Sequence, residues 1–332
     1  NITDFKNQTI NLLADIDLGN HEWPSIGWNG NFYGTLNGNM HVIFNLFISE
    51  NNHWYDYVDY TGLFCYVVEG GSVQNLGLSG GYVYGENCAA ALVNYLENAS
   101  IINCWVEGVE VEAMAYEALV GGIVAYANYS KITNCYSLAD LRLGIFGAAG
   151  GIVGETYTND ESLFSNCYFA GSIEYEFIAN AGSIFGRFLT ENTSIVPVAS
   201  SFYYARNTFP LIGYSTLLPG SILSASSFFY QNNELTLSND VDPNMDSNPA
   251  TSLLIALNEG AEVSFYPWDS SLWYEDSFGM IRLNPIAYAE VTPNLWTDED
   301  IVDLDWYYNN IGSNSFYIST PAELGGLAYL VN

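Results

Sequence analysis

Basic residues are the scarcest chemical class in this 332-residue chain. It holds 6 Lys and Arg residues against 37 Asp and Glu residues, which gives a formal net charge of -31 at pH 7. A surface this anionic repels phosphate groups, so the composition excludes nucleic-acid binding and polybasic attachment to membranes. Cations, calcium included, would be attracted.

Long apolar runs and cysteines are also in short supply. No run of about 18 apolar residues is present, so we expect no membrane insertion. The chain opens at Asn1 without an initiator methionine or a signal-peptide pattern, and from this we expect a mature or excised piece of a longer protein. The 5 cysteines are odd in number and too sparse for a disulfide scaffold.

What the sequence has is an internal repeat. An Asn-Cys-aromatic triplet recurs at intervals of 31 and 32 residues, beginning at Asn103, Asn134 and Asn166. Blocks of a small residue followed by aliphatic residues run in step with it from Gly62 to Gly182, where proline is absent. Short apolar runs between Gly and Asn turns are typical of strands. The period therefore predicts an all-β fold, a parallel β-helix with coils of about 30 residues and two or three short strands in each.

Stacked coils give each repeated residue a role. We predict that Asn103, Asn134 and Asn166 form an amide ladder at a bend, with side chain bonded to side chain. Glycines would make tight corners where a Cβ would clash. We interpret the second column as reduced, buried packing residues, with one disulfide or a metal site as the alternatives. That column is Cys104, Cys135 and Cys167.

These blocks resemble the GLUG repeat of large bacterial surface proteins, which include filamentous-haemagglutinin-like adhesins and some IgA-protease-type proteins. The resemblance is carried by Gly122-Ile-Val with Asn134-Cys-Tyr, and by Gly151-Ile-Val with Asn166-Cys-Tyr. The stretches at 9–43 and 317–332 resemble segments that precede GLUG coils, so the likeness covers roughly 1–205 and 306–332. It implies a right-handed parallel β-helix. Ala90 and Ala91 depart from the usual glycine pair.

The chain divides into four predicted segments. Residues 1–205 form the β-helix with GLUG-like coils, 206–285 form a C-terminal cap region rich in aromatics, 286–305 form a connector, and 306–332 begin a further module. In the resembled family the last of these segments comes first, so the sequence is circularly permuted relative to it. We expect either a module cut from tandem near-identical units or an unusual processing site. Thr320, Pro321 and Glu323 predict a capped helix over about 321–331 that would cover the first coil of the next unit.

Catalytic motifs are missing. His21, His41 and His53 do not form a zinc motif, and no Gly-x-Ser-x-Gly elbow, phosphate loop or dinucleotide fingerprint occurs. Asp15 and Asp17 share one strand face, and we interpret them as residues that turn and solvate an edge, with paired glycosidase carboxylates as the alternative. We therefore expect no catalytic residues, no cofactor and no enzyme activity, with a polysaccharide lyase or hydrolase as the alternative.

Three further patterns are compatible with a bound ligand or an attached sugar. Asp240, Asp242 and Asp246, with Asn244 between them, loosely match a calcium loop but lack its Gly and terminal Glu. The aromatic cluster 54–60 fits sugar stacking, subunit packing or a loop covering the solenoid. Five sequons mark candidate N-glycosylation sites at Asn1, Asn7, Asn98, Asn128 and Asn192.

These observations predict a structural and interaction module of a long, secreted, acidic tandem-repeat protein. It would form an extracellular fibre or an adhesive surface layer by head-to-tail stacking, as a homopolymer or as tandem units of one chain. Surface glycans are the other expected partners. The alternatives are a glycan-binding adhesin domain and a polysaccharide-degrading β-helix enzyme.

Overall fold

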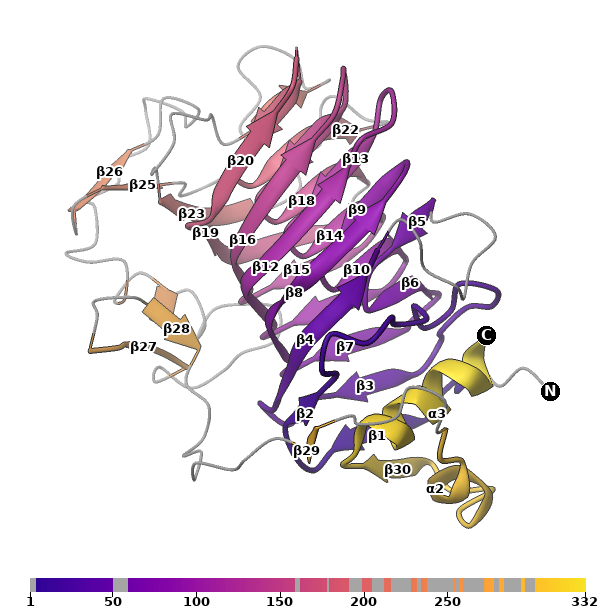
Figure 1. Cartoon of the computed structure of the whole chain (residues 1–332). Coiled ribbons are helices and arrows are strands. Elements are labelled where there is room, and N and C mark those ends of the chain that lie inside the picture. The colour runs from indigo at the N-terminus through magenta and orange to yellow at the C-terminus, as the bar shows by residue number, and fades with distance from the viewer. Residues whose placement is uncertain are drawn as a thin grey trace.

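The computed structural model shows a right-handed parallel β-helix (Figure 1). It describes residues 4–49, 59–158, 162–177, 179–190 and 302–332, with shorter pieces between 199 and 295. Each full coil contributes one strand to each of four parallel sheets, which we name A to D, and the chain visits them in the order D, C, A, B. The sequence predicted two or three strands per coil. The coils have four because a bend separates the strands of sheets A and B, and a corner separates those of sheets D and C.

The strands stack in the following order within each sheet. Sheet A contains β30 (Ser315–Ile318), β1 (Thr9–Leu12), β3 (Thr35–Asn37), β7 (Ser72–Gln74), β11 (Ser100–Ile102), β15 (Lys131–Thr133), β19 (Leu163–Phe169) and β23 (Ala199–Tyr204). Sheet B contains β29 (Asn294–Leu295), β2 (Ile16–Asp17), β4 (Val42–Ile48), β8 (Gly77–Gly85), β12 (Trp105–Ala113), β16 (Tyr136–Leu143) and β20 (Ser172–Tyr175). Sheet C contains β6 (Phe64–Val68), β10 (Val93–Glu97), β14 (Val124–Asn128), β18 (Val153–Thr158), β22 (Phe185–Thr190) and β24 (Ile212–Ser215). Sheet D contains β5 (Tyr60–Thr61), β9 (Cys88–Ala90), β13 (Leu119–Gly121), β17 (Ala148–Gly150) and β21 (Asn180–Gly182).

The repeat period seen in the sequence is the coil length. On sheet D the residues Thr61, Ala89, Val120, Ala149 and Ala181 lie above one another, at steps of 28, 31, 29 and 32 residues. Because the core positions of neighbouring strands are in register, one face of each sheet faces a continuous core. A column of that core runs through Val73, Ile101, Ile132 and Phe164, all at most 2% exposed.

Glycine marks the corner between sheets D and C. Gly121, Gly150 and Gly182 lie in one column, and a Cβ on any of them would come within 2 Å of the carbonyl oxygen three residues later. The corner closes too tightly for a side chain, so glycine is required here by close backbone approach. In the preceding coil Ala90 takes the same position.

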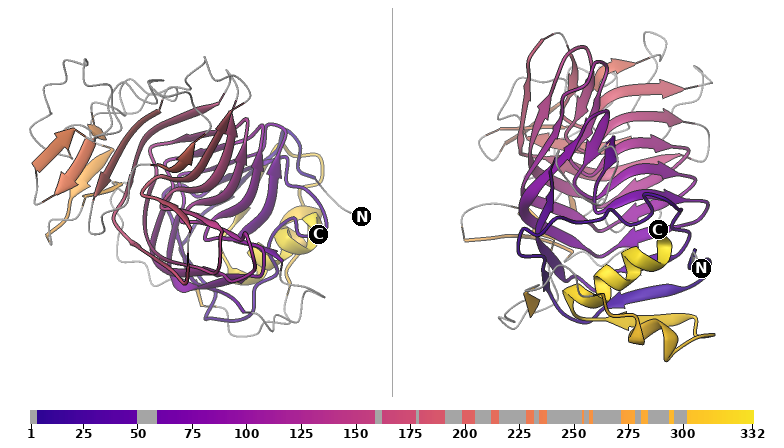
Figure 2. Two further views of the ribbon diagram at one scale, coloured as in Figure 1. Left: turned by 90° about the horizontal axis from the view of Figure 1, so that it is seen from above. Right: turned by 45° about the vertical axis from the view of Figure 1, so that its right-hand side comes forward.

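The C-terminal segment covers the first coil of the same chain (Figures 1 and 2). β30 pairs in parallel with β1, and the helix α3 (Pro321–Val331) lies beside them. The short helix α2 (Asp305–Tyr308) places Trp306 and Tyr307 against Phe5, with ring centroids 6.0 and 5.6 Å from the Phe5 ring. We name residues 302–332 the end cap.

The helix α3 of the end cap is capped at its start and attached to the first coil at its end. α3 begins with a capping box in which Thr320 and Glu323 bond each other's backbone N–H groups, at 3.2 and 2.9 Å. At the other end the Asn332 side chain accepts from the Gly27 and Trp28 N–H groups and donates to the Ser25 carbonyl. The sequence led us to expect this segment on the first coil of a following unit, whereas here it completes its own first coil.

The described part of the predicted cap region, 206–285, begins with β24, which continues sheet C, and its other strands lie beside the solenoid. Its hairpin of β27 (Trp273–Glu275) and β28 (Ile281–Leu283) packs on the outer face of sheet B. The strands β25 (Phe228–Gln231) and β26 (Glu234–Leu237) extend from β23. No helix among the described residues is long and apolar enough to cross a membrane.

Candidate functional site

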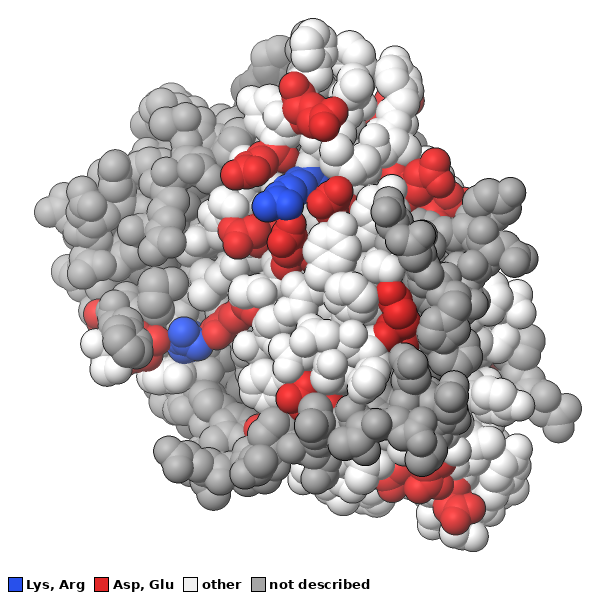
Figure 3. Space-filling view, in the orientation of Figure 1, with Lys and Arg blue, Asp and Glu red and all other residues white. Residues whose placement is uncertain are grey.

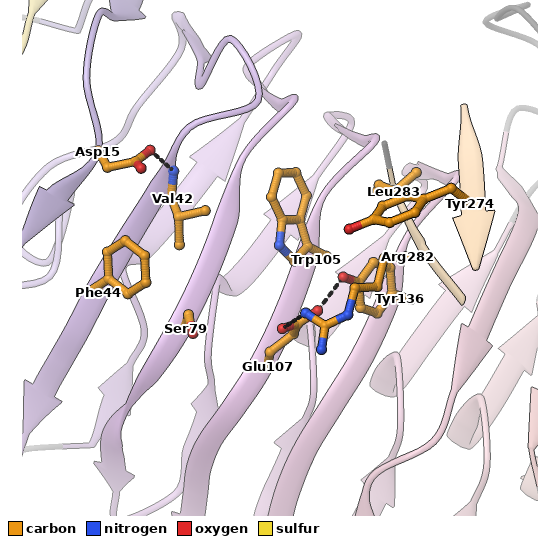
Figure 4. A pocket seen from close by; sticks show the side chains of 10 residues that line it. All are labelled: Asp15, Val42, Phe44, Ser79, Trp105, Glu107, Tyr136, Tyr274, Arg282 and Leu283. Atoms are coloured by element: carbon orange, nitrogen blue, oxygen red, sulfur yellow. Dashed lines mark hydrogen bonds and ion pairs between the residues drawn. The ribbon is translucent and has the colours of Figure 1, made fainter. Parts of the chain in front are cut away.

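A groove of about 280 Å³ lies on the outer face of sheet B, where the β27–β28 hairpin stands against it (Figure 4). We name it the hairpin groove. Its floor is formed by consecutive coils, through outward-facing residues of β4, β8, β12 and β16. Its wall is formed by Tyr274, Arg282 and Leu283 of the hairpin. The floor residues are Asp15, Val42, Phe44, Ser79, Trp105, Glu107 and Tyr136.

The pleat of the strands places these side chains outside. In β12 the side chain of Val106 is fully buried in the solenoid core, so its neighbours Trp105 and Glu107 point to the opposite face. The Trp105 indole lies over Gly77 of the coil below, since a Cβ on Gly77 would come within 2.3 Å of the ring. The glycine therefore lets the indole lie flat along the sheet.

Glu107 is the electrostatic centre of the groove. It forms an ion pair with Arg282 and accepts a hydrogen bond from the Tyr136 hydroxyl. Arg282 also pairs with Asp276, Nε to Oδ2, at 2.8 Å. Burial lowers the pKa of the Arg282 guanidinium, but Glu107, Tyr136 and Asp276 together outweigh it and the pKa is raised. Burial, and then the Glu107 charge, raise the pKa of Tyr136 well above its usual value, so this hydroxyl stays a donor.

The far end of the groove is closed by Asp15, a buried carboxylate. Asp15 lies 3.0 Å from the His41 Nδ1 atom and accepts from the Val42 N–H at 2.9 Å. Asp17, its predicted partner, instead accepts from Asn45 Nδ2 and from the Gly19 N–H. Each of the two carboxylates therefore has its own hydrogen-bond partners, and only Asp15 lines the groove.

Aromatic rings hold the hairpin on the sheet. Tyr136 and Tyr168 stack at 5.1 Å with an interplanar angle of 8°, and Trp273 packs on both at 5.8 Å. All three are at most 2% exposed. The sequence showed this column, as the third residue of each Asn-Cys-aromatic triplet, but not its partner, because Trp273 lies more than a hundred residues away along the chain.

A second groove, of about 340 Å³, lies further along sheet B around Arg142. Arg142 pairs with Glu110 and reaches Glu112 and Glu174 at 3.9 and 3.8 Å (Figure 3). The guanidinium occupies the centre of this acidic patch. Over the described ranges, no three His, Cys, Asp or Glu residues are arranged to hold a metal ion.

The Asn column forms an amide ladder longer than predicted. Each side-chain Nδ2 donates to the Oδ1 of the coil below, over distances of 2.7–3.1 Å. Four of its residues have φ between 52° and 57°, a left-handed conformation that Asn tolerates better than other residues with a Cβ. The ladder runs through Asn166, Asn134, Asn103, Asn75, Asn37 and Asn11.

The cysteine column lies inside the core as free thiols. Cys104, Cys135 and Cys167 each donate to the carbonyl oxygen two residues earlier, at 3.2–3.3 Å. Burial raises the pKa of Cys104 to about 12, so the thiol stays protonated.

A column of tyrosines lies on the outer face of sheet C. Tyr66, Tyr95 and Tyr126 are in register, with ring centroids 5.5 and 5.1 Å apart. The next two positions are Glu155 and Arg187, an ion pair at 3.0 Å. Burial raises the pKa of Tyr66 and Tyr126 to about 12 and also raises that of Glu155.

The remaining predicted sites fall in three groups. Asn7 and Asn98 are exposed, and Asn128 is half-buried with Nδ2 donating to Glu97. Asn1 and Asn192 lie outside the described residues, and so do the candidate calcium ligands Asp240, Asp242 and Asp246. Of the aromatic cluster, only Tyr60 is described, and it is 44% exposed.

Comparison with known proteins supports the fold. No protein-family model matches the chain. A crystal structure described as that of "a putative immunoglobulin A1 protease" from Bacteroides ovatus is similar over 86% of this chain and 88% of its own, with a TM-score of 0.50 and 20% identity. A protein of Evansella cellulosilytica described as a "Putative Gly-rich membrane protein" is 41% identical over 90 residues. That match spans 27% of this chain and 10% of the relative.

Proposed function

We propose that this β-helix is a structural and interaction module of a larger, acidic, extracellular surface protein, with GLUG-type repeats. The observation that carries the proposal is the unbroken amide ladder from Asn166 to Asn11. It joins consecutive coils through side chains as well as through the parallel sheets. A rod in which every coil is bonded twice to the next resists bending, and stiffness suits a spacer or a fibre.

We propose that the module is not catalytic. The carboxylates that face the hairpin groove already have strong partners: Glu107 pairs with Arg282, and Asp15 accepts from the Val42 backbone. A general acid or base needs a proton that it can exchange with substrate, which such fixed contacts oppose.

Head-to-tail assembly, in this proposal, uses the end cap. The edge of β1 is occupied by β30, so a neighbouring unit cannot simply add to the first coil. It can do so if the caps are exchanged, with the end cap of one unit completing the first coil of the next. Such an exchange is a heterologous contact that gives an open filament.

A reversible lock tests this assembly. Thr9 and Ser315 are in-register neighbours on the parallel strands β1 and β30, and paired strands lie about 4.8 Å apart, so the double variant Thr9→Cys/Ser315→Cys should close a disulfide between β1 and β30 of one chain. Multi-angle light scattering and electron microscopy would follow the full chain over rising concentration. We expect filaments from the unmodified chain, monomers from the oxidised double variant, and filaments again after reduction. The single variant Thr9→Cys is the control.

Two results would contradict the proposal in different ways. If the unmodified chain stays monomeric at every concentration, it does not self-assemble. If the oxidised double variant still forms filaments, assembly does not use cap exchange.

A further inference from the structure

We propose that the hairpin groove binds one ring of an uncharged saccharide. The groove lies on the side of the rod and shares no residue with the end cap, so this inference is independent of the assembly proposed above. Five features of its described residues carry it: size, rigidity, paired polar groups, apolar surfaces and the sign of its charge.

The groove has the size of one small ring. Its volume of about 280 Å³ is close to the lower limit for small-molecule sites, about 300 Å³. Four neighbouring strands in register form the floor, so the floor residues are held by the sheet before any ligand binds. A preformed site avoids the entropy cost of ordering on binding.

The polar groups match a ring that carries hydroxyls, since each hydroxyl both donates and accepts. The contacts of Arg282 with Glu107 and Asp276 use Nη1 and Nε, so Nη2 can donate to a ligand. Its side chain is 32% exposed and that of Glu107 is 16% exposed, so both remain within reach of a ligand in the groove. Carboxylate and guanidinium side by side can each take one of two adjacent hydroxyls.

Apolar surfaces complete the match. Phe44 and Val42 line the floor, and the Tyr274 ring lines the wall (Figure 4). The C–H faces of a saccharide ring are apolar and pack on aromatic rings, while its rim is polar. A small apolar ligand would make no hydrogen bond to the Glu107–Arg282 pair, and a small ion would make no contact with the aromatic side chains.

The charge of the groove selects against anions. Asp15, Glu107 and Asp276 outnumber Arg282 around the groove, and the whole chain carries -31. Uronic acids and sialylated glycans would therefore be repelled on approach. The geometry favours hexoses, pentoses or N-acetylated sugars.

The experiment is calorimetric titration of the full chain with named probes. These are cellohexaose, xylohexaose, maltohexaose, laminarihexaose and chitohexaose, with hexagalacturonate as the anionic probe. We expect at least one neutral probe to bind and hexagalacturonate not to bind. Ser79→Leu fills the groove from the floor, next to Glu107 of the neighbouring coil, and replaces no charged residue. It should weaken binding about tenfold or more, equivalent to about 1.4 kcal/mol.

Two matched variants complete the design. Glu174→Gln lies in the second groove around Arg142 and should bind the probe like the unmodified chain. Thermal unfolding of Ser79→Leu should match that of the unmodified chain, which separates a filled groove from a misfolded chain. The proposal is overturned if no neutral probe binds, if only hexagalacturonate binds, or if folded Ser79→Leu binds with unchanged affinity. The groove would then be a packing seam between the hairpin and the sheet.

Discussion

The two ends of the amide ladder differ in how they stop. At the first coil, Asn11 Nδ2 donates to Ser315 Oγ and to the Phe316 carbonyl, so the last donor is satisfied by the end cap. At the other end, Asn166 Oδ1 is a fully buried acceptor that receives no hydrogen bond from any described residue. Its Nδ2 group bonds Asn134 and also the Leu257 carbonyl.

The register explains the open end. Ser165 pairs with Ser200, but Cys167 pairs with Ser201, so the following coil is one residue short at the position opposite Asn166. The tyrosine column changes one coil earlier, where Glu155 follows Tyr126. The comparison teaches that a ladder depends on the residue count of every coil as much as on residue type: one missing residue ends the column.

The largest effect should come from cutting the ladder in its middle. Asn134→Ala removes a buried side chain that donates to Asn103 and accepts from Asn166, and leaves both partners unsatisfied. We expect a loss of about 3 kcal/mol in the free energy of unfolding, measured by urea titration. Asn98→Ala is the control, because Asn98 has a similar φ of 48° but is exposed. Equal losses in the two variants would mean that the backbone conformation, and not the ladder, is what Asn provides.

A smaller effect is expected at the closed end. Asn11→Ala breaks the bond from Asn37 and the contacts to the end cap, but these groups are only partly buried and water can replace them. The expected loss is about 1–2 kcal/mol by the same titration. A loss as large as that of Asn134→Ala would show that the cap end is as critical as the middle of the ladder.

At the Asn166 end of the ladder, a change in sequence should raise the free energy of unfolding. Inserting one Asn after Ser200 restores the residue count and supplies a donor for Asn166 Oδ1. We expect stability to rise by about 1 kcal/mol. Inserting Ala at the same place is the matched control, and an equal effect of both insertions would remove the ladder from the explanation.

The smallest effect concerns the tyrosine column at high pH. The pKa of Tyr126 is about 12 in the folded chain against 10.0 for an ordinary tyrosine, so the folded state holds this proton longer. The resulting stability is fully present below about pH 10 and is lost as the pH rises towards about 12. Urea midpoints of Tyr126→Phe should therefore fall less steeply over this range than those of the unmodified chain. Parallel curves would indicate an unperturbed hydroxyl.

The sequence predicted the columns better than their ends. The β-helix, the coil of about 30 residues and the Asn positions follow from the repeat, because identical residues at a fixed period must stack. The sequence did not predict the other three members of the ladder, because no Cys follows the Asn in their coils. These are Asn75, Asn37 and Asn11. Residue type alone, without the triplet, gave too little signal in an Asn-rich chain.

The groove could not be predicted in the same way. Its floor comes from one or two residues per coil, but Tyr274 and Arg282 reach it from a segment outside the repeat. Periodicity gives no information about such contacts. The end cap was foreseen as a helix from its Thr-Pro-x-Glu start, while the coil that it completes depends on contacts about 300 residues apart.

Completion of the first coil by residues 302–332 sets an order of events during biosynthesis. β1 leaves the ribosome about 300 residues before β30, so its edge stays unpaired while the later coils are being made. Closing a loop of that length is entropically costly and slow compared with adding one coil to the next. The upper coils can therefore form first, and the coil that begins the chain is the last to be finished. Until then its exposed strand is the place where a nascent chain can join another copy.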